Sequence, residues 1–176
     1  MTGYYPYLIA ALPVLYFAQS APISAEQFLG LCRRFLSEGD MEILDACSLD
    51  GNYSPQAAHP TLKKWQEFDA GLRNELVKIR ASRKQIDPQR YQRGERQAEA
   101  AVTHIAMNAY RDPSALAAEK TLDGARWHFL EEAAGGHYFD LDALIIYKLK
   151  LLILERWLRF ALTDAASVIA ELIPKG

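Results

Sequence analysis

The sequence contains little cysteine. Among its 176 residues there are two, Cys32 and Cys47, and no CxxC pair. Two thiols in a chain of this length do not make a disulfide framework of the kind that small secreted domains use. The composition therefore predicts reduced, small buried thiols and a cytoplasmic protein.

The first 32 residues contain no lysine or arginine. Residues 4–18, YYPYLIAALPVLYFA, are uncharged and include Pro6 and Pro13. A secretory signal carries basic residues before its apolar core. A membrane-spanning helix needs about 20 apolar residues and is interrupted by proline. We therefore expect neither, and predict that residues 1–22 form an extended arm, or a short strand over YLIAAL, that packs on the helices.

Strand patterns are nearly absent beyond this arm, and helical periodicity takes their place. Ser24 and Gln27 form a capping box, and Asp140 is predicted to cap a long apolar helix that starts at residue 141. The fold class is predicted as mainly α: a compact bundle of about six to seven helices with a short extended or β N-terminal segment, in one domain. Its predicted parts are the arm (1–22), a helical hairpin (24–48), helices with a basic middle (61–134), and central and C-terminal helices (140–173).

Positive charge is concentrated in the middle of the chain, although the net charge is −2. Residues 78–96 hold seven basic and two acidic side chains. We interpret this run first as a solvated helix end and loop, then as a surface for an acidic protein face, and last as a nucleic-acid site. No nucleic-acid partner is expected, since no recognised motif occurs. The residues of this run taken as candidates for partner binding are Arg83, Lys84, Arg90 and Arg93.

Lys150 breaks the pattern of the central helix. A helical projection places it among Ile146, Ile153, Leu154 and Trp157, opposite the other charged side chains. An amine on an apolar face pairs with an acid, extends to the surface or meets a partner. The first two, with Glu131 or Glu132 as the acid, are the favoured interpretations. Lys150 and Arg156 complete the set of partner-binding candidates.

The segment RWHFLEEAAGGHYFDLD holds most of the polar residues that could carry chemistry. Neither HExxH, a phosphate loop nor a GxSxG motif occurs. No catalytic residue and no cofactor are therefore assigned. Helix capping and turn formation account for these side chains. The alternative is a small metal-dependent hydrolase that uses His128, Glu131, His137 and Asp140.

Three segments resemble an uncharacterised bacterial family whose genes lie in operons for V-type (archaeal-type) ATPases. They are YYPYLIAALPVL, PISAEQFLGLCRRFLSEGDMEIL and GARWHFLEEAAGGHYFDLDALIIYKLKLLILERW. The helical pattern is also loosely similar to that of the C/d family of V-type ATPase components, which form the funnel-shaped socket between the axle and the membrane ring.

The resemblance implies a non-catalytic accessory, assembly or stalk-associated protein that acts by binding ATPase subunits. Such a protein is expected to be cytoplasmic and peripheral to the inner membrane only through the ATPase.

Overall fold

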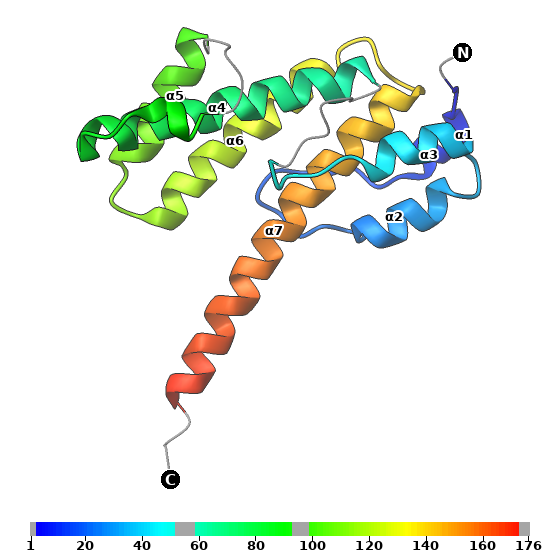
Figure 1. The fold of residues 1–176 in the computed structure, drawn as a ribbon. Helices are drawn as coiled ribbons and strands as arrows, with labels where there is room; N and C mark the ends of the chain where they lie inside the picture. Colours follow the sequence, from blue (N-terminus) through cyan, green and yellow to red (C-terminus); the bar gives the residue numbers. More distant parts are fainter. Residues whose placement is uncertain (1–2, 52–58, 93–98, 173–176) are drawn as a thin grey trace. The chain divides into compact units, whose positions relative to one another are not determined.

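The computed structural model describes residues 3–51, 59–92 and 99–172, with the side chains of the last helix described as far as Thr163. These residues form seven α-helices and one 3-10 turn, with no strand among them (Figure 1). The predicted mainly α class is confirmed. The helices are α1 (Pro6–Ala11), α2 (Ala25–Cys32), α3 (Glu38–Asp45), α4 (Pro60–Lys84), α5 (Ala100–Arg111), α6 (Ala115–Ala133) and α7 (Leu141–Leu172), and the 3-10 turn η1 spans Pro88–Arg90.

The chain divides into two compact units. The terminal unit joins Met1–Leu49 to His137–Gly176, and the middle unit is Asp50–Gly136. The predicted single domain stays a prediction.

In the terminal unit, α2 and α3 pack against α7. Helix α2 starts with the predicted capping box, in which the Ser24 hydroxyl accepts from the Gln27 amide and the Gln27 side chain accepts from the Ser24 amide. Its first amide, on Ala25, donates to Glu155 Oε1 of α7 over 2.7 Å. This bond joins the start of α2 to α7.

The predicted extended arm is wrong for residues 6–11, which form helix α1. Pro6 occupies the first turn, where its fixed φ suits a helix and its missing N–H is not needed. Leu8, the one fully buried side chain of α1, supplies apolar burial worth about 1.5–3 kcal/mol. After α1 the chain still reaches the central helix, because the Tyr147 hydroxyl donates to the Pro13 carbonyl over 2.8 Å.

In the middle unit, α4, α5 and α6 pack pairwise. The small side chains Ala106 and Ala109 of α5 are buried among leucines of the neighbouring helices, so that the helices approach closely. The sequence predicts a helix over about 92–110, with Ala98 and Ala101 among its contact residues. The described helix spans Ala100–Arg111; residues 93–98 lie outside the described residues, and Ala101 is exposed.

Helix α7 is one continuous helix. The sequence predicts a break near Asp164 and a separate short helix, whereas the backbone stays helical to Leu172. No glycine or proline lies between Leu141 and Leu172, so nothing in the local sequence forces a break. Within the described parts of the chain, no helix is both long and apolar enough to cross a membrane.

Candidate functional site

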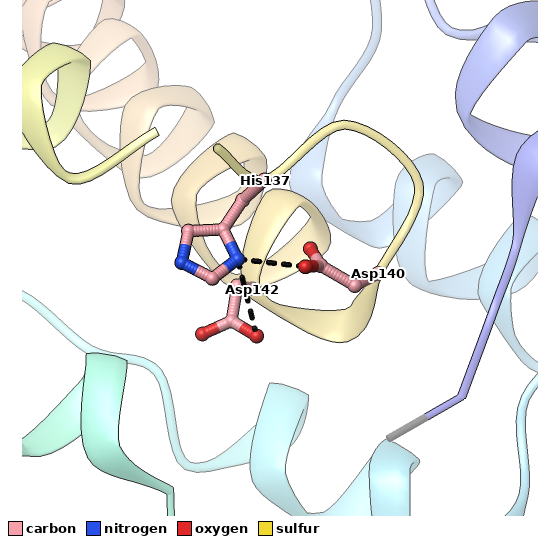
Figure 2. Close-up of side chains that lie close together, drawn as sticks. All are labelled: His137, Asp140 and Asp142. Carbon is pink, nitrogen blue, oxygen red and sulfur yellow. Dashed lines mark hydrogen bonds and ion pairs between the residues drawn. The ribbon is translucent and has the colours of Figure 1, made fainter. Parts of the chain in front are cut away.

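Three polar side chains converge at the start of α7 (Figure 2). His137 Nδ1 lies 2.6 Å from Asp140 Oδ2 and 3.6 Å from Asp142 Oδ2. We call His137, Asp140 and Asp142 the His137 cluster. The chain enters it through Gly136, whose φ of +88° is readily adopted only by glycine.

Asp140 has two roles. Its Oδ1 atom accepts from the Ala143 amide over 3.1 Å, which makes it the N-cap that the sequence predicts. Its Oδ2 atom faces His137.

The cluster has the composition of a cation site. One ligand atom from each residue lies within 4.8 Å of the others. The Asp142 side chain is 11 % exposed, whereas that of His137 is 36 % exposed, so one side of the group is open to solvent. Imidazole and carboxylate ligands suit zinc, and three protein ligands leave a position for water. The same atoms also make a histidine–carboxylate ion pair when His137 is protonated.

The other two residues of the predicted metal set have partners on their own helix, α6. His128 is 72 % exposed and its Nε2 atom lies 3.4 Å from Glu132 Oε1. Glu131 accepts from the Trp127 indole N–H over 2.8 Å. The structure thus brings together His137 and Asp140 of the predicted set and adds Asp142. The spacing HxxDxD, which runs from a turn into a helix start, is the sequence signal that points to Asp142.

The fully buried lysine of α7 is Lys148, and the sequence-predicted Lys150 is half-buried. Lys148 Nζ donates to the Leu44 carbonyl near the C-terminus of α3 over 2.5 Å. Burial lowers the pKa of Lys148. The charges of Cys47 and Asp45 act in the opposite direction and raise it, but by less. A helical projection of α7 alone does not predict that Lys148 is buried, because its hydrogen-bond acceptor is a backbone carbonyl of α3.

Both cysteines are buried and carry free thiols. Burial raises the pKa of Cys32 and of Cys47 to about 12, although the nearby Lys148 lowers both. The thiolate is the nucleophilic form. At neutral pH neither side chain is an effective nucleophile.

The predicted basic candidates lie at the end of α4 and after it. Arg83, Lys84 and Arg90 are exposed, and an Arg83 guanidinium N–H donates to the Tyr110 hydroxyl over 3.1 Å. Arg93 lies outside the described residues. Arg156 of α7 lies with its guanidinium carbon 5.8 Å from the centroid of the Phe160 ring.

A family model described as "Protein of unknown function (DUF2764)" matches residues 100–175. The matched segment contains α5, α6 and α7 and therefore the His137 cluster. The chain is similar to that family over this segment, and the description attaches no activity to it. No curated protein and no solved structure matches the chain.

Proposed function

We propose that this chain is a non-catalytic accessory, assembly or stalk-associated protein of a V-type (archaeal-type) rotary ATPase, and that it acts by protein–protein interaction. The choice of partner rests on the resemblance of its three segments. The match to DUF2764 includes residues 137–157, the most specific part of that resemblance. The match itself carries no function.

The observation that carries the interaction role is the exposed basic end of the middle unit. The side chains of Arg80, Arg83, Lys84 and Arg90 are all exposed. Helix α4 ends at Lys84 and is followed by Gln85, whose φ of 54° is left-handed, and by η1 at residues 88–90. Basic residues are thus presented on both sides of one turn. Such a surface attracts an acidic protein face and steers its approach.

Co-purification tests this proposal. The tagged full chain, expressed in cells that assemble the ATPase, is expected to retain ATPase subunits at physiological salt. Reversal of two charges in R83E/K84E should abolish that retention. The matched control is R33E/R34E, which makes the same change in charge at exposed residues of the terminal unit. A chain that stays strictly free, or equal retention of both variants, contradicts the proposal.

A second candidate function is metal-dependent hydrolysis at the His137 cluster. It is favoured by the convergence of one imidazole and two carboxylates within 4.8 Å. His137, Asp140 and Asp142 would hold a divalent cation, which when bound supplies an activated water.

Titration with Zn²⁺ and Mn²⁺ in a calorimeter tests the second candidate. We expect one cation per chain, with binding lost in His137→Ala and Asp142→Asn. His128→Ala is the control, because His128 belongs to the sequence-predicted set but lies outside the cluster. Absence of binding, or binding that His137→Ala leaves intact, rules this candidate out.

A further inference from the structure

Exposed aromatic side chains gather where two distant segments of the terminal unit meet. Tyr4, Tyr7 and Tyr138 are 71 %, 87 % and 70 % exposed, and Phe139 is 39 % exposed. Aromatic rings bury large apolar areas and are usually covered, at least in part. Four rings on two short segments therefore keep much of their area exposed at the surface.

The two segments are held together by their backbones. The Tyr5 amide donates to the Phe139 carbonyl over 2.6 Å, and Tyr4 and Asp140 form an isolated antiparallel bridge. The Tyr4 and Phe139 rings meet edge to face, with 6.0 Å between their centroids. This pair is a fixed platform, because α1 on one side and the capped start of α7 on the other hold its two segments.

The surroundings of the platform are acidic. Residues 1–32 and 137–147 contain no lysine or arginine. Asp140 and Asp142 follow Phe139 closely, and the Tyr5 hydroxyl donates to Asp40 of α3. Helix α3, which Tyr5 contacts through Asp40, also carries the exposed acids Glu38 and Glu42 two residues to either side of Asp40. The nearest lysine along α7, Lys148, is buried and donates to the Leu44 carbonyl.

We propose that the Tyr4–Phe139 platform and the acids beside it bind a lysine- or arginine-rich segment of a partner protein. Ammonium and guanidinium groups are attracted to the faces of tyrosine and phenylalanine, and tyrosine is enriched among the residues that dominate interface energies. Carboxylates beside the rings add a complementary charge. The same carboxylates repel anionic lipid headgroups and nucleic-acid phosphates.

This surface differs from the one that carries the proposed function. The basic end of α4 lies in the middle unit and attracts acids, whereas the platform lies in the terminal unit and attracts bases. The inference does not depend on the identity of the ATPase. Loss of ATPase binding by R83E/K84E would not contradict the proposed binding of a basic segment at the platform.

Site-specific photocrosslinking in the full chain tests the proposal. A benzoylphenylalanine replaces Tyr7 or Tyr138 in cells, and mass spectrometry identifies the crosslinked peptide. We expect a peptide of net positive charge from another protein, captured from both positions. The charge reversal E38K/E42K should lower the yield about tenfold, with the circular dichroism spectrum and melting temperature unchanged.

The control position is Leu116 of α6, which is 52 % exposed in the middle unit. Yields at residues 7 and 138 no higher than at Leu116 would overturn the proposal. So would crosslinks to lipid, to nucleic acid or to an acidic or uncharged peptide. A crosslink to residues 78–90 of a second copy would replace the partner with self-association, and would overturn it as well.

Discussion

The two units bury polar groups in opposite ways. The middle unit encloses a network of paired charges, whereas the terminal unit encloses neutral thiols, partly buried phenols and two charged side chains, Lys148 and Asp142, that are not joined to each other in a network. A buried ion costs several kcal/mol of desolvation unless its partners are in place, so the network depends on the completeness of its contacts. A buried thiol or phenol, which is neutral at pH 7, has only a small desolvation penalty until the pH approaches its pKa. The two units are therefore expected to fail under different conditions.

The network of the middle unit centres on Arg126. Its Nε atom lies 2.6 Å from Asp69 Oδ1 and a terminal nitrogen lies 2.9 Å from Asp123 Oδ1. Arg73 Nε lies 2.6 Å from the other oxygen of Asp69. Burial lowers the pKa of Arg126, but the charges and hydrogen bonds of the two aspartates outweigh that effect and raise it. The guanidinium thus stays charged.

In the terminal unit, the raised pKa values belong to groups that are neutral at pH 7. Burial raises the pKa of Tyr147 to about 12, and burial with a hydrogen bond to Asp40 does the same for Tyr5. Burial likewise raises the pKa of Cys32 and Cys47 to about 12.

The largest expected effect comes from removal of the central guanidinium. Arg126→Met leaves two carboxylates buried without it and should cost about 3–5 kcal/mol of unfolding free energy. Urea unfolding followed by tryptophan fluorescence in a Trp157→Phe background reports the middle unit, which contains Trp65 and Trp127.

The matched control for that substitution is Arg73→Met. The Arg73 side chain is 35 % exposed, so that water can replace its contact with Asp69. We expect a cost of about 1 kcal/mol or less. Equal losses of unfolding free energy in Arg126→Met and Arg73→Met would show that burial does not determine how much each ion pair contributes to stability.

Alkaline pH should weaken the terminal unit. A thiol whose pKa is raised on folding adds stability that is complete below its unfolded value of 9.0 and is lost as pH rises towards the folded value of about 12. Cys47→Ala removes one such group. It should reduce the slope of unfolding free energy against pH by up to about 1.4 kcal/mol per pH unit in this interval.

The slope is measured by urea unfolding at several pH values, with circular dichroism as the signal, and compared with wild type. Lys148, with a lowered pKa, changes stability in the opposite direction as pH rises towards 10.5. Because Cys47 raises the pKa of Lys148, the difference in slope between wild type and Cys47→Ala contains the coupling between these two groups as well as the thiol itself. An unchanged slope would mean that Cys47 does not remain a neutral thiol in the fold.

Helix caps provide a smaller comparison between the units. Asp140 caps α7, and Ser114 caps α6 by accepting from the Ala117 amide over 3.2 Å. Each replacement by alanine should cost about 0.5–2 kcal/mol. We expect Asp140→Ala to lie at the upper end, because it also removes the partner of His137, and Ser114→Ala at the lower end. Thermal unfolding and hydrogen exchange in each first turn measure the difference, and the reverse order would contradict it.

The smallest effect is expected at Arg83. Its side chain is fully exposed, and its bond to Tyr110 is made in water. Arg83→Ala should leave the melting temperature unchanged within error while it weakens retention of an acidic partner. A clear drop in melting temperature would assign Arg83 to the fold and not to a binding surface.

Much of the helical structure follows from local sequence. The capping box of Ser24 and the cap made by Asp140 were both predicted, because each depends on residues within one turn of the helix. The predicted break near Asp164 and the extended arm were wrong for related reasons. Helix termination was inferred where no residue enforces it, and a run with two prolines was taken as extended although Pro6 can start a helix.

The amino-acid sequence by itself determined the helical class, most helix starts and the basic character of residues 78–96, since these depend on spacing and composition. Only the tertiary structure decided which polar groups meet. Asp142 lies beside His137 and Asp140, and Lys148 donates to the Leu44 carbonyl. Arg126 donates to Asp69, which is 57 positions away in the sequence. The physical reason is that a buried polar group is stabilised by a partner close in space, and local periodicity contains no information about that partner.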